Sequence, residues 1–130
     1  MKKIILLLPI VYVVFSCTQN EISNPLIGKW AFKTTGSAGN PHEFTQTFVK
    51  TDVFDEHNSG IIFMENNQVI ENKTIGFCGT PPVVFDRCEG SWKQDGRKIY
   101  VDESGVFNKI KKCYEIVSVN EKTLILKYNK

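Results

Sequence analysis

The chain has 130 residues, of which 16 are basic and 14 acidic, for a formal net charge of +2. One domain of this size buries roughly two-thirds of its unfolded surface, which leaves no room for a second. The sequence has no strongly basic stripe of the kind that binds a phosphate backbone, so we expect no nucleic-acid partner.

The first residues have the layout of a secretory signal. A basic start, Lys2-Lys3, precedes an apolar run from Ile4 to Phe15 that is too short for a bilayer span of about 20 residues. The sequence Val14-Phe15-Ser16-Cys17 resembles the lipobox of bacterial lipoproteins, in which a small residue precedes a cysteine that receives diacylglycerol. The resemblance implies a signal peptide at 1–16, lipidation of Cys17 and a protein anchored to a cell-envelope membrane, on its periplasmic or surface face.

The lipidated cysteine and a tether occupy residues 17–25, because Thr18 to Pro25 is polar, lacks periodicity and ends in proline. The domain follows at 26–130. Short stretches of β-branched and aromatic residues alternate there with turn residues, and no window favours an amphipathic helix. The pattern predicts strands at about Ile27–Thr34, Glu43–Phe54, Gly60–Glu65, Val69–Phe77, Val83–Lys93, Lys98–Asp102, Phe107–Val119 and Thr123–Tyr128.

Alternation of side chains separates an apolar face from a mixed one. Trp30 and Phe32 lie on one side of the first strand, opposite Lys29 and Lys33. The sequence therefore predicts an all-β fold, a small antiparallel up-and-down β-barrel of about eight strands, with a sandwich as the alternative.

The cysteines that remain after Cys17 are Cys78, Cys88 and Cys113, and an oxidising compartment favours one bridge among them. Loop-closure entropy favours each pairing by about 3 to 4 kcal/mol and does not choose. An Asp95-Gly96 turn that pairs Trp92 with Ile99 would place Cys113 too far from Cys88. We predict a Cys78–Cys88 disulfide across a loop with two prolines, and Cys113 as a small buried hydrophobe.

Three stretches resemble a known family. Gly28-Lys29-Trp30 is similar to the Gly-x-Trp element of lipocalins, whose indole closes one end of the barrel. With Gly76–Pro82 followed by Gly90-Ser91-Trp92, and Tyr114–Val119 followed by Leu124–Leu126, the chain resembles the lipocalin-like domains of bacterial lipoproteins over most of Leu26 to Tyr128. The resemblance implies a small β-barrel and no particular function; the chain is shorter than a full lipocalin and has no helix signal after its last strand.

An eight-stranded barrel is filled by side chains or holds one small ligand. The aromatic side chains that we expect inside, as ligand-binding residues or simply as core, are Trp30, Phe32, Phe48, Phe63, Trp92 and Tyr114. The leading hypothesis is a non-enzymatic binder of a small hydrophobic or amphipathic ligand. The alternative is a module with a filled barrel that binds or inhibits another envelope protein.

Signals for catalysis or metal binding are missing from the sequence. His42 and His57 have no ligand at metal-binding spacing, and the acidic residues near His57 lack the calcium-loop pattern. We find no nucleophile motif or phosphate loop, and no carboxylate pair is singled out, so we expect no enzyme, cofactor or metal. The one basic cluster, Lys109, Lys111 and Lys112, is interpreted as a solvated face.

Overall fold

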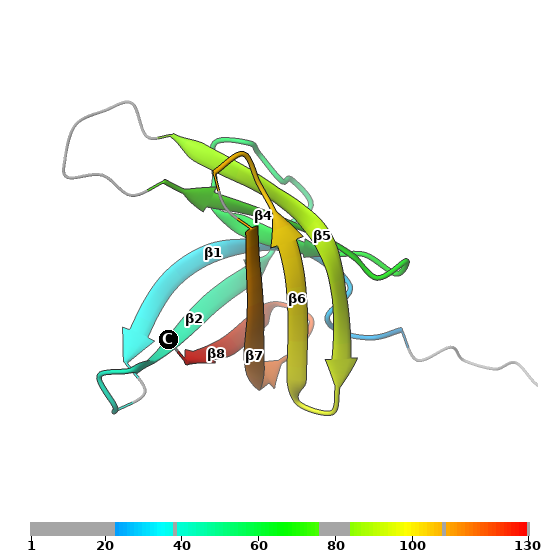
Figure 1. Ribbon diagram of the computed structural model, residues 1–130. Coiled ribbons are helices and arrows are strands. Elements are labelled where there is room, and N and C mark those ends of the chain that lie inside the picture. The colour runs from blue at the N-terminus through cyan, green and yellow to red at the C-terminus, as the bar shows by residue number, and fades with distance from the viewer. Residues whose placement is uncertain (1–22, 38, 76–83, 108, 130) are drawn as a thin grey trace, which may run out of the picture.

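The structure is a computed structural model that describes residues 23–37, 39–75, 84–107 and 109–129. These residues form eight strands and no helix: β1 (Gly28–Ser37), β2 (Glu43–Lys50), β3 (Gly60–Phe63), β4 (Gln68–Thr74), β5 (Phe85–Asp95), β6 (Lys98–Ser104), β7 (Lys109–Val119) and β8 (Thr123–Asn129). They close into an antiparallel barrel (Figure 1), which confirms the predicted fold class. In the ranges described, no helix is long and apolar enough to cross a membrane.

One connection departs from a sequential meander. The strands run around the barrel in the order β1-β2-β8-β7-β6-β5-β4-β3, so that β1 lies between β2 and β3. Residues 51–59 therefore carry the chain from the end of β2 across β1 to the start of β3. Because β3 is short, it pairs with β1 only from Gly28 to Ala31, and Phe32 N–H then donates to the Ser59 carbonyl at 2.9 Å. Beyond this point β1 continues to Ser37 paired with β2 alone, among the residues described.

The β5–β6 hairpin differs in register from the prediction. Gly96 and Arg97 are the central residues of its turn, Asp95 pairs with Lys98, and Trp92 pairs with Val101. The predicted pairing of Trp92 with Ile99 is therefore wrong by two residues. Gly96 has a φ of 59° at the first central position, the arrangement in which only that residue needs a positive φ.

A hydrophobic core fills the end of the barrel where β1 begins. Leu26 and Trp30 are fully buried there, and the Trp30 indole donates a hydrogen bond to the Leu26 carbonyl at 2.8 Å. The Lys50 ammonium lies 4.4 Å from the centre of the Trp30 ring. Each large apolar side chain buried in this way contributes about 1.5 to 3 kcal/mol. Further core residues are Ile61, Phe63, Val69, Trp92, Ile99, Val101, Ile116, Leu124 and Leu126.

Candidate functional site

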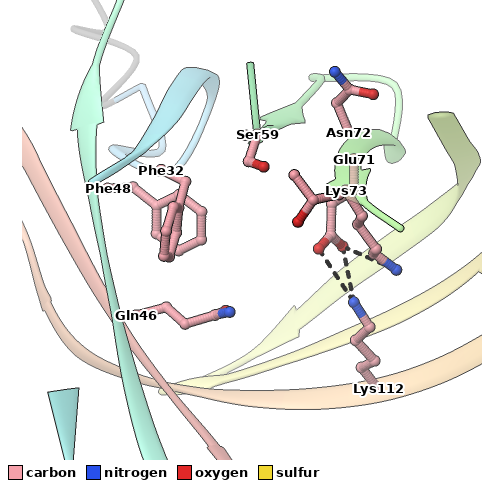
Figure 2. A pocket seen from close by; sticks show the side chains of 10 residues that line it. Phe32, Gln46, Phe48, Ser59, Glu71, Asn72, Lys73 and Lys112 are labelled. Carbon is pink, nitrogen blue, oxygen red and sulfur yellow. Dashed lines mark hydrogen bonds and ion pairs between the residues drawn. The ribbon is translucent and has the colours of Figure 1, made fainter. Parts of the chain in front are cut away.

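A cavity of about 230 Å³ opens in the barrel wall where β3 begins, between the second half of β1 and β4 (Figure 2). We call it the side cavity. Phe32 and Phe48 form its apolar wall, with ring centroids 5.9 Å apart and the rings edge to face. Its other lining residues are Gln46, Ser59, Gly60, Glu71, Asn72, Lys73, Thr74 and Lys112.

Larger hollows of about 350 and 550 Å³ lie over the outer surface of the barrel. Exposed Tyr100 and Lys111 border the first, and exposed Val53 and His57 border the second. Neither hollow is lined by both acidic and basic buried side chains, which distinguishes the side cavity.

Strand alternation places four charged side chains inside the barrel beside this cavity. Glu71 follows buried Val69 by two positions on β4, and Glu103 follows buried Val101 by two positions on β6. Lys73 and Lys112 occupy the corresponding positions on β4 and β7. We call Glu71, Lys73, Glu103 and Lys112 the charged cluster; their side chains are 13, 21, 0 and 11% exposed.

Lys112 lies at the centre of the charged cluster. Its ammonium donates to both carboxylate oxygens of Glu71, at 3.2 and 3.0 Å, and to the Tyr114 hydroxyl at 3.2 Å. The Lys112 Nζ also lies 3.1 Å from Glu103 Oε1. Lys73 donates to the same Glu103 oxygen, and its Nζ lies 3.7 Å from Glu71 Oε2. Two cations therefore share two carboxylates in a region of low dielectric, where such interactions are strong.

One acceptor in the charged cluster has no partner. Glu103 Oε2 is buried and accepts no hydrogen bond in the part of the chain that the structure describes. An unsatisfied buried acceptor costs about 1 to 3 kcal/mol. The charged cluster thus contains a carboxylate oxygen, Glu103 Oε2, that is free to accept a hydrogen bond from a neighbouring donor.

The two carboxyl groups differ in how easily they ionise. Burial raises the pKa of Glu71 to about 7, because it outweighs the attraction of Lys112, and the Glu103 charge raises it further. Burial alone would also raise the pKa of Glu103, but the charge of Lys112 and the hydrogen bond from Lys73 outweigh it and hold that pKa below its usual value, and Glu71 lowers it further when it is the protonated donor. The pKa of Lys112 is raised, since the charges of both carboxylates outweigh its burial. Near neutral pH, Glu71 is consequently the member of the charged cluster that gains or loses a proton.

Three other polar side chains near the charged cluster are Tyr114, Cys88 and Asp86. Burial, followed by the charge of Glu71, raises the pKa of Tyr114 well above 10, so its hydroxyl keeps its proton. Burial likewise raises the pKa of Cys88, which pairs with Glu71 across β4 and β5. The Asp86 carboxylate accepts the N–H groups of Val106 and Phe107 at 3.0 and 3.4 Å and so orders the turn after β6.

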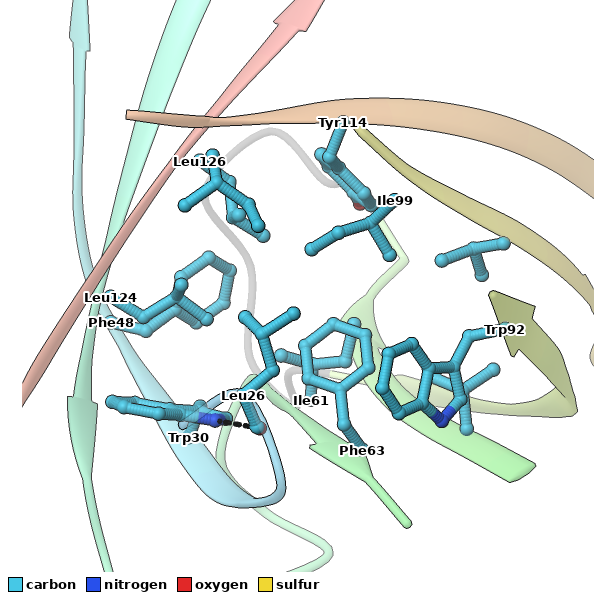
Figure 3. Close-up of a cluster of buried hydrophobic side chains, with 13 residues drawn as sticks. Leu26, Trp30, Phe48, Ile61, Phe63, Trp92, Ile99, Tyr114, Leu124 and Leu126 are labelled. Carbon is cyan, nitrogen blue, oxygen red and sulfur yellow. Dashed lines mark hydrogen bonds between the residues drawn. The ribbon is translucent and has the colours of Figure 1, made fainter. Parts of the chain in front are cut away.

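The six predicted ligand-binding aromatics separate into two groups. Phe32, which is 38% exposed, and Phe48 line the side cavity. Trp30, Phe63, Trp92 and Tyr114 are buried in the core (Figure 3), where Phe63 and Trp92 meet edge to face at 5.0 Å. Tyr114 also connects this core to the charged cluster through Lys112.

The cysteine predictions have mixed outcomes. Cys17 and Cys78 lie outside the described residues, so lipidation and the Cys78–Cys88 disulfide stay predictions. Cys88 is buried as a free thiol in the described structure and is not bonded to Cys113. The prediction that Cys113 is buried is wrong: it points outward, because Lys112 and Tyr114 on either side of it point inward.

The charged cluster was not found from the sequence. Lys112 was assigned to a solvated face, which is wrong, although Lys109 and Lys111 are indeed exposed. The usable signal was alternation: each member of the cluster is a charged residue at an inward position of a strand that also places apolar residues inward. His42 and His57 are exposed, and the described residues contain no group of three or more His, Cys, Asp or Glu that could hold a metal ion.

Comparison of the chain with family models, curated proteins and solved structures gives no match in any of the three. The residues themselves must therefore carry the functional argument. In this site the aromatic rings of Phe32 and Phe48 lie beside the charged cluster inside a barrel. Such an arrangement is suited to holding a small molecule with one apolar and one polar end.

Proposed function

We propose that this protein is a membrane-anchored, lipocalin-like barrel that binds a small amphipathic ligand in the side cavity without chemically changing it. The observation that carries the proposal is the charged cluster beside the cavity. Burying four ionisable groups costs desolvation free energy, and a barrel that needed only stability is served as well by apolar side chains there. Binding of a polar ligand group by these side chains would account for their presence inside the barrel.

The volume of the side cavity limits the size of the ligand. A dry cavity of about 150 Å³ holds benzene, and the side cavity measures about 230 Å³. It therefore accommodates one aromatic ring, or an aliphatic group of similar bulk, with a short polar arm. The apolar part would contact Phe32 and Phe48, and the polar arm would reach Glu71, Lys73 and Lys112 of the charged cluster. Among the residues described, the packed core next to the cavity favours a short ligand over a long acyl chain.

The position of the chain start fits an anchored protein. Asn24, at the beginning of the described chain, donates a hydrogen bond to Gln94 at the core-filled end of the barrel. Lys73, at the side cavity, lies toward the other end of the strands. A lipid on Cys17 would then hold the protein by the end that contains the core and leave the cavity toward the other end. Each buried methylene contributes about 0.8 kcal/mol, so two or three acyl chains anchor a protein stably.

The test uses full-length protein in detergent and a panel of single-ring compounds that differ in their polar end, followed by isothermal titration calorimetry. We expect at least one member to bind, and Phe32→Ala to weaken it about fivefold to tenfold through lost apolar contact. Phe32 is partly exposed, so the variant should fold. The matched control is Phe107→Ala, which removes a 65% exposed ring elsewhere and should leave affinity unchanged. Absence of binding across the panel at millimolar concentration would refute the proposal.

A second candidate is the envelope interaction module, which one observation favours. Val106 and Phe107 are 84 and 65% exposed, so the turn after β6 carries two neighbouring exposed apolar side chains. Crosslinking in intact cells, from a photoreactive residue at position 107, would capture a partner if these two side chains dock on another envelope protein. A crosslinking pattern identical to that of a probe placed at exposed Lys93 would argue against it.

A further inference from the structure

We infer that the polar end of the ligand is a carboxylate, which takes the place of the Glu71 carboxylate at Lys73 and Lys112 while Glu71 becomes neutral and hydrogen-bonds to Glu103. The inference rests on the proposed function and names its ligand class. It follows from three features of the charged cluster: its charge balance, the different depths of its two carboxyl groups, and its unpartnered acceptor.

Among charged groups, the charge balance selects a monoanion. Lys73 and Lys112 carry two positive charges, and Glu103, whose pKa is lowered, supplies one firm negative charge. A ligand carboxylate makes the cluster neutral when Glu71 is protonated. An ammonium group on the ligand would leave a buried net charge of +1 even with both glutamates ionised. A dianionic phosphate would leave a net charge of −1 even with Glu71 protonated. Uncompensated buried charge is costly, so both are disfavoured.

The depths of the two carboxyl groups decide which one the ligand replaces. Glu71 lines the side cavity together with Lys73 and Lys112, and Figure 2 shows dashed lines joining its carboxylate to both ammonium groups. Glu103 is not part of that lining, and its side chain is 0% exposed. A molecule in the cavity can therefore exchange with Glu71, whereas Glu103 stays beneath as the fixed counterion. Gln46 lines the cavity and offers an amide N–H₂ as a further donor to the carboxylate.

The unpartnered acceptor gives the displaced group a partner. Glu103 Oε2 accepts no hydrogen bond in the described structure, and a protonated Glu71 is a hydrogen-bond donor close to Glu103. Once the ligand occupies the lysines, the Glu71 O–H can donate to this oxygen. The exchange therefore leaves each ammonium with an anionic partner and removes the unsatisfied acceptor.

Proton uptake on binding is the measurable consequence. The titratable groups around Glu71 come from four strands: Lys73 on β4, Asp86 and Cys88 on β5, Glu103 on β6, and Lys112 and Tyr114 on β7. Phe32, Gln46, Phe48 and Gly60 line the cavity from β1, β2 and β3, and none of them titrates. Because the pKa of Glu71 is about 7, Glu71 is already neutral at lower pH and must take up a proton at higher pH. The binding-competent fraction falls about tenfold between pH 6 and pH 8, and the affinity should fall with it.

Three probes of similar size test the inference: phenylacetate, 2-phenylethanol and 2-phenylethylamine. Calorimetry on full-length protein in detergent, in two buffers of different ionisation enthalpy, gives affinity and proton uptake together. We expect phenylacetate to bind tightest, to weaken about tenfold from pH 6 to pH 8, and to take up about 0.9 proton at pH 8. Glu71→Gln should bind phenylacetate with no pH dependence and no proton uptake. Glu89→Gln, whose 62% exposed side chain lies on the outer face of β5, should behave as the unmodified protein.

The outcomes separate the two proposals. If the alcohol or the amine binds as tightly as phenylacetate, the carboxylate inference is overturned while the proposed function stands. If none of the three binds, and no other single-ring compound does, the proposed function is refuted as well. Proton uptake that persists in Glu71→Gln would overturn the role assigned to Glu71.

Discussion

Replacing Glu71 by glutamine should remove most of the pH dependence of folding stability between about pH 5 and pH 8. In the unmodified protein the pKa of Glu71 rises from 4.5 in the unfolded chain to about 7 in the fold, principally because the side chain is buried. A carboxyl group with a raised pKa favours the folded state while it is protonated. Its stabilising effect is complete below pH 4.5 and is lost as the pH rises through 7.

The magnitude follows from the size of the shift. Each pKa unit corresponds to roughly 1.4 kcal/mol, so the free energy of unfolding should fall by about 2.5 kcal/mol between pH 5 and pH 8. The other shifted groups do not titrate in this window. The lowered pKa of Glu103 acts below pH 4.5, and the raised pKa of Lys112 acts above pH 10.5.

Urea unfolding at a series of pH values measures the effect. With a denaturant slope of about 2 kcal/mol per molar, the urea midpoint should fall by about 1 M from pH 5 to pH 8. Glu71→Gln should give a nearly constant midpoint, because the amide is always neutral and can donate to Glu103 as the protonated acid does. Glu89→Gln should retain the slope of the unmodified protein. A Glu71→Gln variant that kept that slope would show that another group is responsible.

Three further predictions concern anchorage, close packing and the buried charges. Cys17→Ser should abolish fatty-acid labelling and release the protein from membranes; unchanged labelling would rule out the lipidation site. Gly90→Ala should destabilise the fold by about 3 kcal/mol in thermal or urea unfolding, because the added Cβ would overlap the backbone carbonyl of Asp102, and a change below about 0.5 kcal/mol would contradict this packing. Lys112→Met should cost about 3 to 5 kcal/mol, because Lys73 alone would then have to compensate two buried carboxylates. Lys111→Met, on the exposed face, should change stability by less than about 0.5 kcal/mol; equal effects would mean that Lys112 is not buried.

The fold class could be predicted from the sequence because its determinants are local. On β6, Ile99 and Val101 alternate with exposed residues, and the burial of the strand follows that alternation. The order of β1, β2 and β3 could not be predicted in this way. It depends on whether residues 51–59 cross β1, and no local pattern specifies which strand edge a connecting segment reaches.

The side cavity escaped prediction for a related reason. It lies at Gly60, where β3 begins, and before this residue the barrel lacks that strand in part of its wall. Glu103 was also placed beyond its strand, because the prediction ended β6 at Asp102 and the structure ends it at Ser104. Once that strand is extended, Glu103 falls on the inward face two positions after Val101. Strand ends are the least certain part of any pattern-based assignment. Here the misplaced end of β6 kept Glu103 from being recognised as the buried neighbour of Glu71.

The charged cluster also bears on why this barrel would tolerate a lower stability near neutral pH. Ionising Glu71 costs folding free energy above pH 7, and removing that charge should make the protein more stable there. By our inference, the same substitution removes the link between ligand affinity and pH. Glu71 would therefore lower the stability of the fold and at the same time make binding sensitive to pH. Such a trade-off is common where a functional group is held in an unfavourable environment. If Glu71→Gln gained stability and kept the full pH dependence of binding, the two properties would have separate origins and the link through Glu71 would be wrong.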